Sequence, residues 1–112
     1  MPTRVDDYEV RDGDDVFLTV RVGEGQLGFS TAFVGEEKKT SRRDVSRVPL
    51  GAAAELRGKV LVVSTTVVDI QKEHDRTSVT VVLGNGSEAE YPQSEDAHES
   101  GVVNYLNVVS FV

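Results

Sequence analysis

Residues 16–22 read Val16-Phe17-Leu18-Thr19-Val20-Arg21-Val22, so that every second position is aliphatic. Successive side chains of a β-strand point to opposite faces, whereas an amphipathic helix would place its apolar residues three or four positions apart. The four aliphatic side chains therefore share one face of a half-buried strand, and Phe17, Thr19 and Arg21 share the other. Similar segments recur along the chain and determine the expected fold class.

Further strands are predicted on both sides of this segment, where residues alternate or where valine and threonine accumulate. They cover residues 27–34, 45–48, 59–70, 77–83 and 102–112, with shorter pieces around Tyr8 and Val10 and around Ala89 and Tyr91. We expect one hairpin between residues 8–10 and 16–22 and a second one between 59–70 and 77–83. The pair Asn85-Gly86 suits a type I′ turn that opens a further, short hairpin through Ala89 and Tyr91, and residues 92–101 are expected to form an acidic loop.

These elements predict an all-β fold, namely an antiparallel β-sandwich of about seven or eight short strands, with a small β-barrel as the alternative. At most one short helical turn is expected, near residues 51–57, before Gly58. The chain has 112 residues, which is the usual size of one folding unit. We therefore expect a single β-sandwich domain over residues 1–112.

Composition restricts the classes of partner. The formal net charge is −7, whereas proteins that bind nucleic acid use a basic face for most of their affinity. The chain has no cysteine, so disulfides and thiolate zinc sites are excluded. It begins without an apolar signal core, and its longest apolar run, residues 60–63, is too short to cross a bilayer. We expect a soluble cytoplasmic protein that binds neither nucleic acid nor membrane.

Two patterns with a catalytic or cofactor meaning are weak. The run Gly23-Glu24-Gly25-Gln26-Leu27-Gly28 has the glycine spacing of dinucleotide-binding loops, but such a loop must open a helix. Residues 29–34 have the period of a strand instead, which indicates a hairpin turn. His74 and His98 lie in different predicted loops without a recognisable partner. We expect no catalytic residue and no enzymatic activity; carboxylates that converge from different loops would be the basis of a small enzyme as a third possibility.

Carboxylates in two predicted turns suggest an alternative function. Asp12, Asp14 and Asp15 lie in the first turn, and Asp69 and Asp75 lie in the second. If the strands simply alternate in direction, with one short strand inside residues 36–58, both turns fall at the same end of the sandwich. Calcium prefers oxygen ligands from such loops, although no segment has the spacing of an EF-hand. The alternative is therefore a loop-based domain that binds calcium or a small ligand; otherwise no cofactor is expected.

The only basic cluster of the chain lies within residues 36–43. Lys38, Lys39, Arg42 and Arg43 form a candidate docking patch for an acidic partner. The competing interpretation is a solvated charged loop, because neighbouring carboxylates neutralise much of this charge and because charge runs are usually solvated.

Two predicted strands, residues 60–68 and 102–109, are apolar on both faces. A strand of a two-layer sandwich normally leaves one face in water, so these strands need cover from a loop, from the segment 49–58 or from another chain. We therefore expect a non-enzymatic protein-interaction or structural module that binds a protein partner, or a second copy of itself, through a sheet face or edge. The candidate interface residues are Val103, Tyr105, Val109 and Phe111. We expect the four phenylalanines, Phe17, Phe29, Phe33 and Phe111, in the core.

Overall fold

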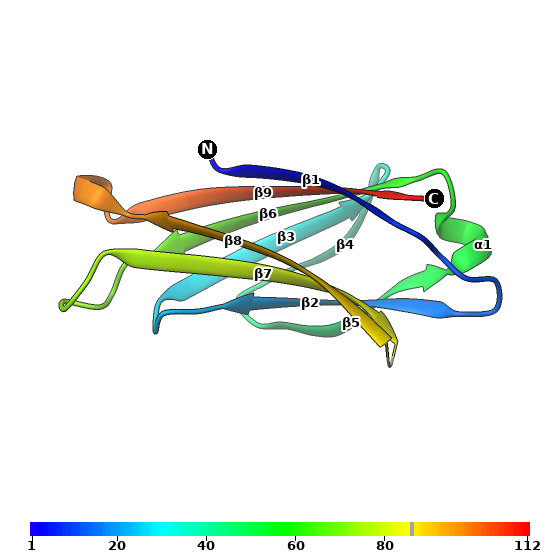
Figure 1. Cartoon of the computed structure of the whole chain (residues 1–112), viewed down its shortest axis with the longest axis horizontal. Helices are drawn as coiled ribbons and strands as arrows, with labels where there is room; N and C mark the ends of the chain where they lie inside the picture. The colour runs from blue at the N-terminus through cyan, green and yellow to red at the C-terminus, as the bar shows by residue number, and fades with distance from the viewer. Residues whose placement is uncertain (86) are drawn as a thin grey trace.

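Nine strands form two sheets that pack face to face in the computed structural model, which describes residues 1–85 and 87–112 (Figure 1). The larger sheet contains, in spatial order, β1 (Thr3–Tyr8), β9 (Val102–Phe111), β6 (Val60–Val68), β3 (Leu27–Val34) and β4 (Glu37–Arg42). The smaller sheet contains β5 (Val45–Ala52), β2 (Asp15–Val22), β7 (Arg76–Asn85) and β8 (Ser87–Asp96). The predicted sandwich is confirmed, and the two sheets do not close into a barrel.

Short helical segments connect some of these strands. The α-helix α1 (Ala53–Leu56) lies inside the predicted turn at 51–57, and a 3₁₀ turn, η1 (His98–Ser100), precedes β9. Within the described residues, no helix is long and apolar enough to cross a membrane.

Two of the predicted hairpins are wrong, whereas the short one through Ala89 and Tyr91 is confirmed, since β7 and β8 pair antiparallel. β1 pairs in parallel with β9, with Thr3 opposite Leu106, instead of pairing with β2. β6 lies between β3 and β9, whereas β7 lies between β2 and β8 in the other sheet. Alternation in a sequence tells which side chains of a strand face inward, but it carries no information about the neighbouring strand. In both wrong cases the two consecutive strands lie in different sheets.

The glycine-rich turn is one of these crossings. Glu24 and Gly25 both have positive φ, 59° and 72°, which permits a tight turn between β2 and β3. A strand follows the glycines, as predicted, and no helix opens there. The hairpin interpretation is wrong, since β2 and β3 belong to different sheets.

Gln26 ties this turn to the β6–β7 connection. Its side chain is only 8% exposed, and its Nε2 donates to Asp69 Oδ1 at 2.8 Å and to the Arg76 carbonyl at 2.9 Å. Its Oε1 accepts from the backbone amides of Ile70 at 2.7 Å and Gln71 at 3.2 Å. One side chain therefore satisfies polar groups from both connections at this end of the sandwich.

Gln26→Ala is expected to lower the free energy of unfolding by about 2–4 kcal/mol, because it leaves several partly buried partners without a hydrogen bond. Gln71→Ala is the matched control, since Gln71 Nε2 donates one exposed bond, to the Gly25 carbonyl. Urea denaturation of both variants measures the difference. Equal losses in the two variants would contradict the assigned role of Gln26.

Two regions that the sequence predicts as loops are strands. The charged residues 37–42 form β4, an edge strand with exposed side chains on both faces, so no alternating pattern marks it. β8 extends through Pro92 into the predicted acidic loop, and proline is tolerated there because β8 is also an edge strand. The predicted type I′ turn depends on Gly86, which lies outside the described residues.

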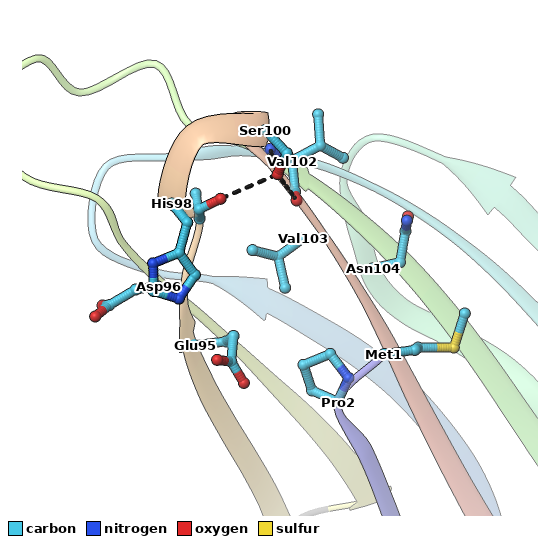
Figure 2. Close-up of a pocket in the computed structure, with 10 residues that line it drawn as sticks. Met1, Pro2, Glu95, Asp96, His98, Ser100, Val102, Val103 and Asn104 are labelled. Atoms are coloured by element: carbon cyan, nitrogen blue, oxygen red, sulfur yellow. Dashed lines mark hydrogen bonds between the residues drawn. The ribbon is translucent and has the colours of Figure 1, made fainter.

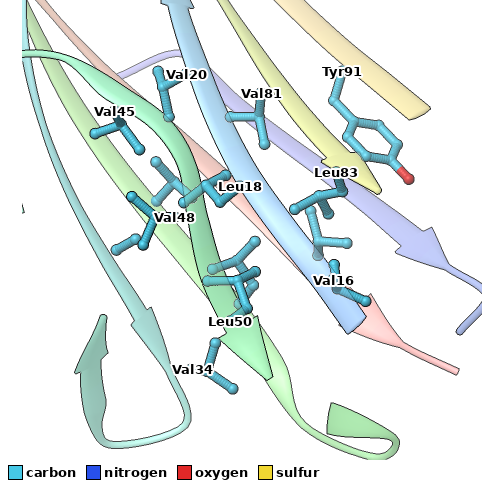
Figure 3. Packing of buried hydrophobic residues seen from close by; sticks show 14 of the residues in the cluster. Val16, Leu18, Val20, Val34, Val45, Val48, Leu50, Val81, Leu83 and Tyr91 are labelled. Atoms are coloured by element: carbon cyan, nitrogen blue, oxygen red, sulfur yellow. The ribbon is translucent and has the colours of Figure 1, made fainter. Parts of the chain in front are cut away.

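The core fills the space between the two sheets (Figure 3). Leu18 and Leu83 of the smaller sheet and Leu61 and Tyr105 of the larger sheet are fully buried. Two hydroxyls, those of Ser30 and Thr65, hydrogen-bond to each other at 2.8 Å inside the larger sheet's inner face. The inner faces are thus closed by the chain itself, and any further surface for a partner must lie outside.

Candidate functional site

The outward face of the five-stranded sheet is built from alternate residues of its strands. Directly opposite residues of neighbouring antiparallel strands share a face, so the register identifies its members. We call this surface the open face. Its central residues are Leu27, Phe29, Thr31 and Phe33 of β3, Val60, Val62, Ser64, Thr66 and Val68 of β6, and Val102, Asn104, Leu106, Val108 and Ser110 of β9. Its rims carry Val5 and Asp7 on β1 and Lys38 and Ser41 on β4.

Exposed apolar side chains concentrate on the open face. Every large hydrophobic side chain that is exposed within a described strand lies there, and none lies on the smaller sheet. These side chains are Val5, Leu27, Phe29, Phe33, Val60, Val68 and Val102. Soluble proteins rarely expose a contiguous apolar patch of this kind unless it binds something.

Charged side chains are missing from the centre of the open face. β3, β6 and β9 contain no charged residue, although 28% of the chain is Asp, Glu, Lys or Arg. The charges begin at the two rims, with Asp7 on β1 and Lys38 on β4. A partner can therefore cover the centre without removing any charge from water.

Polar groups on the open face hydrogen-bond to one another. Thr66 Oγ1 donates to Asn104 Oδ1 at 2.8 Å, and the hydroxyls of Thr31 and Ser41 lie 2.9 Å apart. Groups that already have a partner cost less to bury than free ones. These residues thus lower the penalty for covering the face.

The outward face of the smaller sheet has the opposite character. Arg21 pairs there with Glu90 at 2.8 Å, and both side chains are more than half exposed. The Arg47 guanidinium lies 4.6 Å from the ring centre of Phe17 and covers it. The chain therefore screens an aromatic ring with its own charged groups on one sheet and leaves Phe29 and Phe33 uncovered on the other.

The predicted interface residues lie on the wrong side of β9. Val103, Tyr105, Val109 and Phe111 point into the core and are at most 6% exposed. The other sheet already covers them, so they cannot also cover a partner. The outward side of β9 carries Val102, Leu106 and Val108 instead.

The expectation that all four phenylalanines are core residues is also wrong. Phe111 is 1% exposed and packs edge-to-face against Tyr8, but Phe29 is 46% exposed and Phe33 is 37% exposed. The inward phase of β3 instead carries Ser30, Ala32 and Val34. These small inward residues let the two sheets approach closely at β3. The larger side chains of the strand face outward.

The sequence contains a signal for the correct face of β9. Its even-numbered phase includes Asn104 and Ser110, whereas its odd-numbered phase includes the two largest side chains, Tyr105 and Phe111. The phase with more polar groups is the better candidate for the outward side. The complete lack of charge in β3, β6 and β9 is a second signal that these strands share one uncharged surface.

The candidate docking patch lies on β4 and directly after it. Lys38 is exposed on the open-face rim, and Lys39 pairs with Glu37 at 3.0 Å. Arg42 and Arg43 are exposed further along. The patch is therefore an ordered edge strand with a β-bulge, where lysines commonly oppose the addition of another strand.

The carboxylates of the calcium hypothesis do not converge. Asp12 and Asp14 lie in the β1–β2 connection beside α1 and Asp15 begins β2, whereas Asp69 and Asp75 lie in the β6–β7 connection at the other end of the sandwich (Figure 1). The expectation of a common end is wrong because residues 36–58 hold two strands, β4 and β5, instead of one, so the chain reverses direction once more before β6. Within residues 1–85 and 87–112, no group of three or more acidic or histidine residues has the geometry to hold a metal ion.

These carboxylates also have other partners. Asp12 pairs with Arg57 at 2.8 Å, and Asp69 accepts from Gln26. Asp14 and Asp15 line a depression of about 280 Å³, whose acidic wall is completed by Asp7, Glu9 and Glu88.

A wider depression of about 910 Å³ lies beside η1 (Figure 2). Glu95, Asp96 and His98 line one side of it, and Pro2 and Asn104 line the other. The Ser100 hydroxyl is engaged in the turn itself, since it donates within the backbone of residues 97–102. Among the described contacts, none joins Ser100 to His98, so the depression does not present an activated nucleophile.

Comparisons with protein-family models, with curated proteins and with solved structures find no match for this chain. Its functional interpretation therefore depends on its own geometry.

Proposed function

We propose that this chain is a non-enzymatic protein-interaction module that binds another protein through the open face. The observation that carries the proposal is the concentration of all exposed large hydrophobic strand residues on one uncharged sheet face. Covering apolar surface is the main favourable contribution to association in water.

Rigidity supports the same proposal. Hydrogen-bonded ladders join all five strands of this sheet, from β1 at one edge to β4 at the other. β6 and β9 alone form nine residue pairs. A preformed surface loses little conformational entropy on binding, so more of the hydrophobic gain remains as affinity. The partner that fits is an equally apolar and uncharged protein surface.

Photo-crosslinking in the native cells tests the proposal. Replacing Phe29 with benzoylphenylalanine keeps an aromatic residue at the 46% exposed position and is expected to give covalent protein adducts under light. We expect the adducts in the soluble cytoplasmic fraction, in line with the expected location of the chain.

Two controls probe the smaller sheet. The same analogue at Phe17 replaces a ring that Arg47 covers, and at Glu90 it replaces a side chain that is 56% exposed. Both controls are expected to give few adducts. Equal labelling from positions 29 and 90, or no adduct from position 29, would overturn the proposed function.

A further inference from the structure

We infer that the occupant of the open face is a second copy of this chain, packed face to face around a two-fold axis that runs close to the direction of β6. The inference rests on the proposed function and specifies both the partner and its orientation. It follows from the size of the face, from its lack of charge and from the opposite charges of its two rims.

The size of the face matches a stable dimer. Strands lie about 4.8 Å apart and rise about 3.3 Å per residue, so five strands of six to ten residues span about 600 Å². Two copies would bury about 1,200 Å² in total, without counting the extra surface area of side chains that protrude from the sheet. This value is the lower end of the range for specific interfaces.

Self-association must overcome a net charge of −7 on each copy. β3, β6 and β9 contribute no charge, so the repelling groups stay outside the contact. A two-fold dimer brings the same patch of both copies together, and an uncharged patch can meet itself without placing like charges in contact.

The rims select one of two face-to-face orientations. With the axis along β6, the β1 rim of one copy lies over the β4 rim of the other, so Asp7 faces Lys38. With the axis across the strands, β1 lies over β1 and β4 over β4, which places like charges opposite each other. Opposite charges attract at both rims only in the first orientation.

The strand register brings these charges to nearly the same height. Asp7 is opposite Ser110, which is opposite Val60, whereas Lys38 is opposite Phe33, which is opposite Val62. The two levels differ by two residues of β6, or about 7 Å, which a lysine side chain can span.

Lys38 would also cover the most exposed large hydrophobic strand residue of this face. Val5 is 70% exposed, and the register places it at the level of Val62, the same level as Lys38. The methylene stem of Lys38 from one copy would pack on Val5 of the other while its ammonium reaches Asp7. Sheets that pack face to face in this way usually cross at about 30°.

Light scattering after size exclusion tests the dimer over a wide concentration range. The wild-type chain is expected to form a dimer with twice the 12.2 kDa mass. Asp7→Lys and Lys38→Asp are each expected to raise the dissociation constant about tenfold, because each variant replaces two symmetry-related ion pairs by repulsion. The double variant Asp7→Lys/Lys38→Asp restores both pairs and keeps the net charge of the wild type, so it is expected to recover the original affinity.

Each outcome decides a separate point. A wild-type chain that stays monomeric at all concentrations overturns self-association. Crosslinks from position 29 to a different protein would then leave the proposed function standing. Single variants that dimerise as tightly as the wild type overturn the axis along β6, since in the other orientation like charges are opposed both before and after each substitution. A double variant that fails to restore the affinity overturns the pairing of Asp7 with Lys38. Both residues are exposed, and unchanged thermal unfolding of the variants checks that they fold.

Discussion

Val109→Asp is expected to unfold the chain, whereas Val108→Asp is expected to leave it folded. The two residues are neighbours on β9, but Val109 is fully buried in the core and Val108 is half-buried on the open face. An unpaired carboxylate in the core costs several kcal/mol, which is comparable with the total stability of a small domain. Circular dichroism and urea denaturation measure the contrast.

The pair of variants also separates folding from association. Val108→Asp places a charge on the open face, so the folded variant is expected to lose the dimer and the crosslinks from position 29. A folded Val109→Asp variant together with an unfolded Val108→Asp variant would show that β9 is turned over relative to the structure described above.

Alkaline pH is expected to destabilise the fold through its three tyrosines. Burial raises the pKa of Tyr8, Tyr91 and Tyr105, and nearby carboxylates raise it further. The folded state therefore favours the neutral phenol over the phenolate more strongly than the unfolded state does. This contribution is complete below the ordinary pKa of 10.0 and is lost as the pH rises through the higher folded-state pKa values.

Tyr105→Phe isolates the contribution of the fully buried tyrosine. Thr77 gives its only hydroxyl hydrogen to the Glu95 carbonyl at 2.6 Å, so the fully buried Tyr105 phenol must donate to Thr77. Removing the phenol is expected to cost about 1 kcal/mol at neutral pH and to flatten the loss of stability above pH 10. Urea midpoints across the alkaline range measure both; the same slope in wild type and variant would assign alkaline unfolding to other groups, such as lysines.

The fold class was predictable because it depends on local pattern. Val16 to Val22 carries its inward and outward residues in strict alternation, and the helical turn near α1 is marked by Gly58. Strand partners were not predictable. β6 and β7 have similar valine-rich and threonine-rich sequences, so the sequence is equally compatible with pairing between them. β4 was not predicted, because an edge strand with charged residues on both faces shows no alternation of apolar and polar residues.

The candidate site was predictable only in part. The two-sided apolar character of residues 60–68 and 102–109 correctly indicates that an apolar face remains after the core is filled. Which face remains was decided by packing partners that the sequence does not reveal, since β7 and β8 of the smaller sheet lie against β9 and Thr77 of β7 contacts its odd-numbered residue Tyr105. Phe29 and Phe33 were misplaced for a related reason, because the smaller residues of β3 supply its inward phase.

The position of β9 has a consequence for how the chain folds. β9 is the last strand of this chain, yet it lies inside the larger sheet, between β6 and the first strand, β1. The parallel pairing joins Thr3 to Leu106 across almost the whole sequence. Such long-range contacts must form against the full entropy of closing the chain, so we expect slow, cooperative folding on the millisecond-to-second scale. During synthesis, β1 and β6 would wait for their shared neighbour until β9 emerges.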